Sequence, residues 1–316
     1  MIDLLTTGYT LRHPTLADAP SVEALLTAVE LAEFGEPGDT TLADLLDIWR
    51  RSDLARDAWL VVAPDGGLAG YGYARRRQIV RNDVEVYVHP AHAARRIGTT
   101  LVRLAEAWAR EAVPLAPPGA EVFVTNWINA HNRAACEILE REGYRAVRTF
   151  WRMGITLEPA PPPPSWPGGI TVRTAAEIGD LRPFYDITEE GMADHWGYLA
   201  RPYEDWIERR GGPDFDPQLW FLVLADEEPA AAVLCRSTAG AGWVDTLVVR
   251  RAWRQQGLGL RLLTQAFSAL AQLGQQSARL IVDADNLTGA TRLYERAGMR
   301  IEQEYAAFRK VLEAGA

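Results

Sequence analysis

The sequence predicts a mixed α/β fold built twice, and three observations lead to this prediction. The chain has 316 residues, enough for two domains of ordinary size, and 48% of them are apolar, so each half can bury a core. A proline-rich segment divides the chain near its middle. The stretches on either side of this segment match each other in order. We therefore expect one domain of strands and helices, duplicated.

The dividing segment contains four consecutive prolines at 161–164 and continues into Pro-Gly-Gly at 167–169. Prolines in a row neither continue a helix nor donate to a sheet, so this segment is expected to be an extended linker. The predicted division is an N-terminal domain over 1–158, a linker over 159–168 and a C-terminal domain over 169–316.

The two halves match at a fixed spacing. GYTLR at 8–12 matches GITVR at 169–173, and WLVV at 59–62 matches WFLV at 220–223, both 161 positions apart. Beyond the next helix the spacing falls to 155, which a longer connection around 114–119 in the first half explains. The agreement indicates duplication of one domain.

Each half repeats the same order of elements. A short strand and one or two helices come first. Runs rich in Val, Leu and aromatic residues then predict three strands in each half, over 58–63, 69–76 and 83–88 and over 219–225, 228–236 and 243–249. Apolar residues at helical spacing predict a helix over 257–273. A strand (121–125; 278–283), a helix (132–142; 288–297) and a final β-rich stretch complete each half.

Composition excludes several classes of protein. The net charge of −9 argues against a nucleic-acid partner, which requires a basic face. No run of 18 apolar residues and no apolar leader is present, so we expect neither a membrane span nor a signal peptide. The two cysteines are far apart in sequence, and no metal-ligand pattern is present. We expect a cytoplasmic protein without a metal, either a monomer or a homodimer.

The sequence RQQGLG at 254–259 lies between a predicted strand and a predicted helix. Backbone N–H groups at a helix start are unpaired and carry partial positive charge, and glycines let a phosphate approach them closely. Neither the dinucleotide-binding pattern nor the phosphate-binding loop of nucleotide hydrolases fits, because a third glycine and a Gly-Lys pair are both missing. An ordinary tight turn without a ligand is the alternative.

About 27 residues after this turn comes DNLTGATRLYERAGM at 285–299. Together the two motifs resemble the GNAT acetyltransferase superfamily, over about 169–312 and more weakly in the first half. The resemblance implies two tandem acyl-CoA N-acyltransferase domains, each with a mostly antiparallel central sheet flanked by helices. It also implies acetyl-CoA as co-substrate, held by these residues: Leu247, Val248, Val249, Arg254, Gln255, Gln256, Gly257, Leu258, Gly259 and Asn286.

Two residues are candidates for catalysis. Tyr294 matches the family tyrosine, and a phenol stays protonated at neutral pH and can donate to a departing thiolate; alternatively it packs against the cofactor. Asp245 is a carboxylate in an apolar strand, where desolvation would favour a base or proton relay. Alternatively, Asp245 pairs with an arginine or caps the neighbouring backbone.

The segment at 187–206 is rich in acids and aromatics and is the candidate acceptor site, with Glu190, His195 and Trp196 as binding residues. Acids attract a cationic amine, and aromatic faces hold its body. A solvated helix-loop-helix anchored by tryptophan is the alternative.

The first half lacks several of these groups. Ala93 stands at the position of Arg254, Arg96 at that of Gly257, Val84 at that of Asp245 and Leu139 at that of Tyr294, while Gly98 matches Gly259. We therefore expect the N-terminal domain to be degenerate and non-catalytic. The predicted activity is transfer of an acetyl group directly to a primary amine of a small molecule or peptide. A non-catalytic coenzyme A-binding or protein-interaction protein is the alternative.

Overall fold

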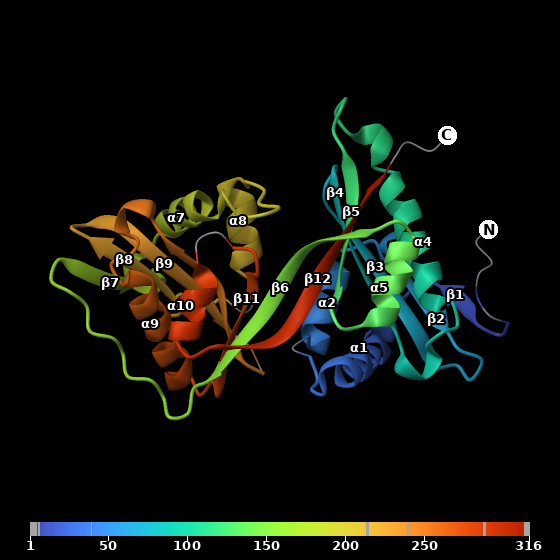
Figure 1. The fold of residues 1–316 in the computed structure, drawn as a ribbon, viewed down its shortest axis with the longest axis horizontal. Helices are drawn as coiled ribbons and strands as arrows, with labels where there is room; N and C mark the ends of the chain where they lie inside the picture. Colours follow the sequence, from blue (N-terminus) through green and yellow to red (C-terminus); the bar gives the residue numbers. More distant parts are fainter. Residues whose placement is uncertain are drawn as a thin grey trace. The chain divides into compact units, whose positions relative to one another are not determined.

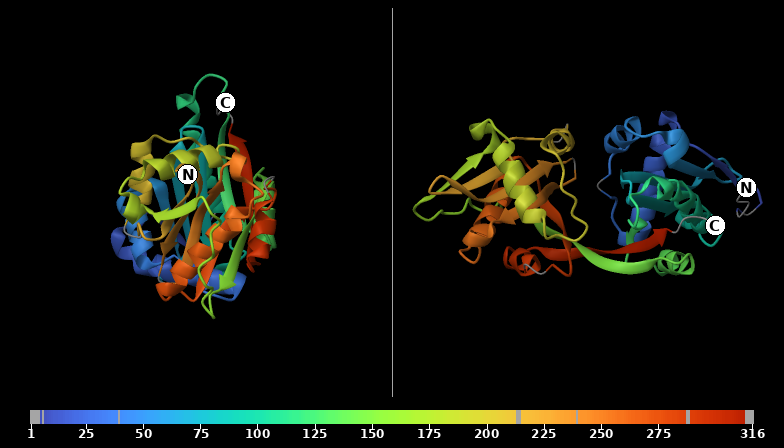
Figure 2. Two further views of the ribbon diagram at one scale, coloured as in Figure 1. Left: turned by 90° about the vertical axis from the view of Figure 1, so that its left-hand side faces the viewer. Right: turned by 90° about the horizontal axis from the view of Figure 1, so that it is seen from above.

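The computed structural model describes residue 5 and residues 7–38, 40–212, 215–238, 240–286 and 289–312. The chain forms two compact units, each a sheet with helices on both faces (Figures 1 and 2). Unit 1 contains 1–150 and 303–316, and unit 2 contains 151–302. The fold is the mixed, mostly antiparallel α/β architecture that the sequence predicts.

Unit 1 has the strand order β1-β2-β3-β4-β5-β12. Its strands are β1 (Thr10–Arg12), β2 (Ala58–Val62), β3 (Leu68–Gln78), β4 (Arg81–Val88), β5 (Val122–Asn129) and most of β12 (Arg300–Leu312). Its α-helices are α1 (Ala19–Phe34), α2 (Leu42–Arg50), α3 (Leu54–Asp57), α4 (Ile97–Arg110) and α5 (Arg133–Arg141), with short 3-10 turns at Leu16–Asp18, Pro90–His92 and Val113–Leu115.

Unit 2 has the strand order β6-β11-β10-β9-β8-β7. Its strands are the second part of β6 (Arg145–Thr156), then β7 (Ile170–Thr174), β8 (Trp220–Ala225), β9 (Glu228–Ser237), β10 (Gly242–Val249) and β11 (Ser277–Asp283). Its helices are α6 (Ala175–Ile178), α7 (Arg182–Met192), α8 (Tyr203–Arg210), α9 (Leu258–Gln272) and α10 (Ala290–Arg296), with a 3-10 turn at Arg251–Trp253.

The predicted elements lie within a few residues of the observed ones. The alternation of side chains along each strand builds two cores per sheet. In unit 2, α9 and α10 cover one face, where Leu262 and Phe267 are buried, and α7 and α8 cover the other, where Phe184 and Trp206 are buried (Figure 2). The helix predicted over 288–297 corresponds to α10, which begins at Ala290 after Gly289. The first residue of the prediction, Thr288, lies outside the described residues.

The compact units differ from the division that the proline-rich segment suggested, because the two halves exchange their last strands. The second part of β6 places Met153 and Leu157 in the core of unit 2. β12 runs antiparallel to β5, from Tyr305 opposite Asn129 to Leu312 opposite Val122, and places Phe308 in the core of unit 1 (Figure 1). Burial of one large apolar side chain contributes about 1.5–3 kcal/mol, so each unit depends on its exchanged strand.

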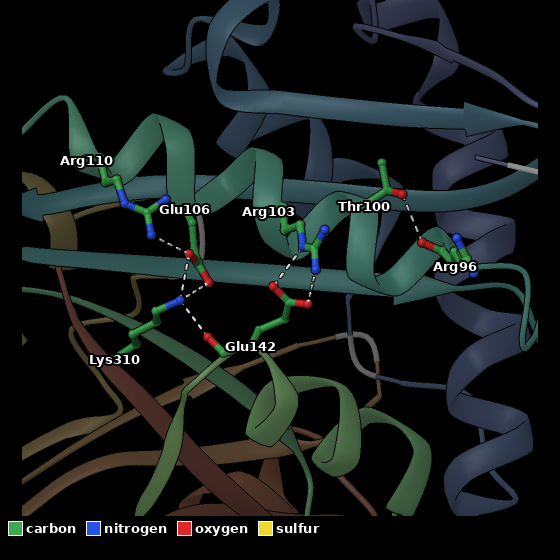
Figure 3. Close-up of polar contacts among 7 residues, drawn as sticks. All are labelled: Arg96, Thr100, Arg103, Glu106, Arg110, Glu142 and Lys310. Atoms are coloured by element: carbon green, nitrogen blue, oxygen red, sulfur yellow. Dashed lines mark hydrogen bonds and ion pairs between the residues drawn. The ribbon is translucent and has the colours of Figure 1, made fainter. Parts of the chain in front are cut away.

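A buried ion-pair network holds β12 against unit 1 (Figure 3). Glu106 of α4 is 3% exposed and accepts hydrogen bonds from Lys310 of β12 at 2.9 Å and from Arg110 at 2.8 Å. Lys310 also donates to the backbone carbonyl of Glu142, whose carboxylate binds Arg103 through two bonds of 2.8 Å. A buried carboxylate requires such partners.

None of the helices in the described residues is long and apolar enough to cross a membrane.

We predict that Lys310→Met lowers the free energy of unfolding of unit 1 by about 2–4 kcal/mol, since it leaves Glu106 buried with less compensation. Native-state hydrogen exchange of amides in α4 and β5 measures this loss separately for unit 1. The control is Arg141→Met, which breaks a pair with Glu137 whose side chains are 74% and 58% exposed and which should cost less than about 0.5 kcal/mol. Equal losses in the two variants would contradict the assignment.

Candidate functional site

The sheet of unit 2 opens between its two parallel strands. β10 and β11 pair only at Gly242–Ala278 and Trp243–Arg279 among the described residues, and the rest of β10 is not paired with β11. The N–H of Arg250 donates to the carbonyl of Ala230 in β9. Main-chain groups of successive residues in a strand point to opposite sides, so those of Leu247 and Val249 point away from β9, toward the side where β11 no longer pairs with β10. This part of β10 therefore presents main-chain donors and acceptors at an open edge.

The RQQGLG turn continues from this edge into α9. Gln255 and Gly257 have φ of 63° and 76°, in the left-handed region, and Gly257 is the residue before the helix. Among the described residues, no acceptor bonds the backbone N–H groups of residues 255–259. A row of unpaired N–H groups at a helix start is a binding site for an anion such as a pyrophosphate. Arg254 lies beside this row, and its Nε donates to the carbonyl of Val249 at 3.0 Å.

A second cation at the turn was missed in the sequence. Arg261 lies one helical turn after Gly257, and a Cβ atom built on Gly257 would be 2.6 Å from its guanidinium. The same guanidinium donates to the carbonyl of Ser165 at 3.2 Å. The i,i+4 spacing from Gly257 was the available signal.

Gly259 also has a packing role that the sequence did not indicate. A Cβ there would lie 3.1 Å from Leu293 and 3.5 Å from Val249, so this glycine permits α9 to pack closely against α10 and β10. The matching Gly98 of unit 1 has the same surroundings, with Ile138 at 3.2 Å and Val88 at 3.6 Å. This glycine therefore serves helix packing in both units.

Tyr294 of α10 is 9% exposed and belongs to the core of unit 2 that contains Leu258. Burial raises the pKa of its phenol to about 12, so the hydroxyl stays protonated at neutral pH. Its hydroxyl makes no hydrogen bond to the described residues. A protonated donor without an internal partner is suited to a thiolate.

Asp245 lies at a β-bulge, where the pairing of β10 with β9 shifts between Val244 and Thr246. Its carboxylate accepts a hydrogen bond from Arg236 Nε at 3.1 Å, and its side chain is 29% exposed. The desolvation that the sequence argument required is therefore absent, and the alternative of an arginine pair describes its surroundings. A bulge redirects side chains locally, which explains the position of the carboxylate.

The acids of the predicted acceptor segment have partners within unit 2. Glu190 forms an ion pair with Arg250 at 2.9 Å, and Asp194 forms one with Arg251 at 2.5 Å. Glu189 accepts a hydrogen bond from the hydroxyl of Tyr198. Arginines therefore offset the charges of Glu190 and Asp194 locally, so these two acids provide less attraction for a cationic amine than the number of acids suggests.

The remaining predicted residues lie on either side of the opening. Trp196 is half-buried in the loop between α7 and α8. Asn286 lies in the turn after β11, and its N–H donates to the carbonyl of Asp283 at 3.1 Å. Leu287 and Thr288 of the same motif lie outside the described residues.

His195 is half-buried in the same loop as Trp196. Burial lowers the pKa of its imidazole, while Asp283 and Asp194 raise it and Arg254 lowers it. Asp283 ends β11 and Arg254 follows β10, so the charges that act on His195 come from both strands of the opening. The imidazole is neutral at pH 7 and makes no hydrogen bond to the described residues. A neutral, unpaired imidazole can accept a proton.

Unit 1 keeps the backbone of this site and differs in its side chains. Ala94 and Arg96 both have φ of 61°, matching Gln255 and Gly257, although neither is glycine. Thr100 stands in place of Arg261 and donates to the Arg96 carbonyl at 2.9 Å (Figure 3). Pairing of β4 with β5 continues to Val84–Asn126, further than the equivalent pairing in unit 2.

A family model described as the acetyltransferase (GNAT) family matches residues 23–144 and 181–299, one match in each half and together most of the chain. The chain belongs to the GNAT acetyltransferase family. It is an N-acetyltransferase with two GNAT regions, as the paired motifs predicted.

Similar proteins match this chain over most of its length. A GCN5-related N-acetyltransferase from Sphaerobacter thermophilus is 37% identical, with a TM-score of 0.88 over 99% of this chain and 98% of that one. A tandem GNAT protein from the clavulanic acid biosynthesis pathway, 15% identical, has a TM-score of 0.72 over 98% and 99% and shows the shared fold. A mycothiol acetyltransferase of Nocardiopsis dassonvillei is 28% identical over 89% of this chain and 90% of its own length.

We predict that the imidazole of His195 titrates below the ordinary value of about 6.5. NMR titration measures this pKa, and a His195→Gln spectrum identifies the resonance. Asp283→Asn should lower the pKa further, because Asp283 stabilises the imidazolium, and Arg254→Gln should raise it. A pKa at or above 6.5 in the wild type would contradict the burial of this side chain.

Proposed function

We propose that unit 2 transfers the acetyl group of acetyl-CoA directly to a primary amine of a small molecule. One observation carries the proposal: the unpaired N–H groups of residues 255–259 follow directly from the open edge of β10. These N–H groups, with Arg254 and Arg261, fit the pyrophosphate of coenzyme A. The main-chain groups of Leu247 and Val249 fit the amides of its pantetheine arm and the thioester carbonyl.

The residues of unit 2 divide the proton transfers between them. In the reaction the amine nitrogen forms a bond to the acetyl carbon, and the carbon–sulfur bond breaks. Main-chain N–H groups of β10 stabilise charge on the thioester oxygen. Tyr294 donates its hydroxyl proton to the departing thiolate. His195 accepts the proton that the amine loses.

His195 is a better candidate than Asp245 for accepting the amine proton. Its imidazole is neutral and has no hydrogen bond to the described residues, whereas the carboxylate of Asp245 is held by Arg236. The hydrogen bond from Arg236 occupies an oxygen of the Asp245 carboxylate, whereas no described residue occupies the imidazole of His195. Asp245 then serves to neutralise Arg236 beside the acceptor.

Unit 1 is proposed to be non-catalytic. Leu139, 2% exposed, stands where unit 2 has Tyr294, and Val84, 1% exposed, stands where it has Asp245. Apolar side chains at both places remove the proton donor and the polar group of the bulge. The N-terminal half of the chain instead provides the second part of β6, which forms part of the sheet of unit 2.

The relatives support a small molecule as the acceptor. Several curated relatives at about 28% identity carry the name mycothiol acetyltransferase. We extend to this chain the class of acceptor, a small molecule with a primary amine. The chain matches these relatives over 89% and 95% of its length, which supports the proposed likeness to mycothiol synthase in architecture.

Calorimetric titration with acetyl-CoA should give one site per chain. Gly257→Arg should weaken binding at least about tenfold, because the new side chain covers the N–H groups of the turn. The matched control is Arg96→Gly, which makes the reverse change in unit 1 and should leave one site of unchanged affinity. Two sites in the wild type would contradict a single binding unit, and no binding at all would favour a protein-interaction role.

Tyr294→Phe should lower kcat by about 100-fold, since general acid catalysis typically contributes factors of this order. The dissociation constant of acetyl-CoA and the thermal midpoint should remain unchanged, because the lost hydroxyl has no partner within the described residues. Steady-state kinetics with a thiol-detecting reagent, calorimetry and thermal unfolding measure the three quantities. An unchanged kcat would remove Tyr294 from the mechanism.

The pH dependence of kcat/KM separates the two candidate bases. If His195 accepts the amine proton, kcat/KM falls as the pH decreases through the lowered pKa of its imidazole, below about 6.5, because the imidazolium cannot accept a proton. His195→Gln should abolish this acidic limb together with most of the rate. Asp245→Asn should retain it, and the opposite pattern would assign the role to Asp245.

A further inference from the structure

Arg210, the last residue of α8, lies over the β-bulge of β10. Its Nη2 donates to the hydroxyl of Thr246 at 2.9 Å, and the guanidinium lies 5.9 Å from the ring centre of Trp206. The bulge places Thr246 next to Asp245, on the sheet face covered by α7 and α8. This is the face of the sheet opposite the one that α9 covers.

The guanidinium of Arg210 has more donors than partners. A guanidinium carries five N–H bonds. Within the described residues the single hydrogen bond of Arg210 is the one to Thr246. The residue is half-buried, and burial lowers the pKa of its guanidinium, so its charge is partly removed from water without a carboxylate partner. An unpaired and partly desolvated cation is costly unless a ligand completes it.

Charged groups lie near Arg210, but among the described residues no carboxylate forms an ion pair with its guanidinium. Asp245 and Glu189 act on it as anions, and Arg236 and Arg201 act on it as cations. Asp245 is already bound to Arg236. Glu189 accepts hydrogen bonds from the hydroxyl of Tyr198 and from the backbone N–H of Arg201, so neither carboxylate is bound to Arg210.

The duplicated unit shows that packing alone does not require an arginine here. α2 matches α8 at the 161-residue spacing, and Trp49 stands at the position of Arg210. Trp49 is 1% exposed, and its indole donates to the hydroxyl of Tyr71 at 2.9 Å. Unit 1 therefore fills this place with a satisfied apolar side chain, whereas unit 2 has a cation with unused donors.

We propose that Arg210 binds a carboxylate of the acceptor, so that the substrate of unit 2 is a small amine that also carries a carboxylate group. This inference rests on the proposed acetyl transfer and adds the class of acceptor. The planar fork of a guanidinium binds a carboxylate through two parallel hydrogen bonds. Thr246 holds the guanidinium in place, and Arg236 is occupied by Asp245.

The test uses the full chain with coenzyme A present and a panel of amino acids that differ in the number of carbons between amine and carboxylate. Each compound is paired with its primary amide, which keeps the shape and removes the negative charge. Calorimetry measures dissociation constants, so turnover is not needed for a result. The best wild-type ligand should bind at least about tenfold more tightly as the acid than as the amide.

Three variants locate the effect. Arg210→Gln should reduce the preference for the acid to less than twofold and leave the amide constant unchanged. Arg210→Lys, which keeps the charge without the fork, should retain only part of the preference. Thr246→Val, which removes the anchor, should weaken the preference less than Arg210→Gln does. Unchanged affinity for acetyl-CoA confirms that each variant is folded.

Several results would overturn the inference. These are equal binding of acid and amide by the wild type, a preference that persists in Arg210→Gln, or tighter binding of O-phosphoethanolamine than of any carboxylate. Acetylation rates measured on the same panel test the proposed function separately. If amines are acetylated without preference for acids, the inference fails and the proposed function stands. If acids bind through Arg210 and no amine is acetylated, the carboxylate site stands and the proposed function fails.

Discussion

The exchange of strands between the two halves is the constraint on which the rest of the structure depends. β12 comes from the C-terminal half of the chain and pairs with β5 in unit 1, and the second part of β6 comes from the N-terminal half and completes the sheet of unit 2. Met153 and Leu157 in one core and Phe308 and Leu312 in the other each contribute a few kcal/mol of burial. Net domain stabilities are about 5–15 kcal/mol, so neither sheet is independent of the strand it receives. The ion pair between Glu106 of α4 and Lys310 of β12 holds this strand against α4.

The duplicated sites show what the fold requires and what the chemistry requires. The left-handed turn before the long helix is present in both units, although Arg96 replaces glycine at a conformation that costs other residues roughly 1–2 kcal/mol. The packing glycines Gly98 and Gly259 also match. Arg261, Tyr294, Asp245 and Arg210 have no counterpart of the same chemistry in unit 1. The two units therefore share the backbone geometry of the turn and differ in the side chains around the opening between β10 and β11.

Much of the fold and part of the candidate site could be predicted from the sequence. Strand alternation, helical spacing and the internal match gave the elements, because these patterns record local burial. The exchange could not be predicted, since β6 and β12 carry the same apolar alternation whichever sheet they complete. The RQQGLG turn was recognisable from its glycines, whereas the role of Gly259 in packing required its neighbour Leu293, which is distant in sequence.

The side-chain environments were the least predictable part of the site. Asp245 was expected to be desolvated from its apolar strand, but a bulge exposes it, and its partner Arg236 lies on another strand. The number of acids in 187–206 suggested a site for a cationic amine. The partners of Glu190 and Asp194, Arg250 and Arg251, come from a different part of the chain and could not be identified from the segment itself. The sequence did not predict a role for Arg210, because an arginine at the end of a helix is common. Its lack of a carboxylate partner among the described residues is seen only in the structure.

The exchanged strands also determine the order in which the protein can be completed during synthesis. A ribosome releases the chain from its N-terminus, and N-terminal domains generally fold first. Here unit 2 ends at residue 302, while unit 1 requires residues 303–312 to finish its sheet. Unit 1 is thus the first to be synthesised and the last to have its sheet completed. Until then the edge of β5 has no partner, and the nascent chain must keep that edge from pairing elsewhere.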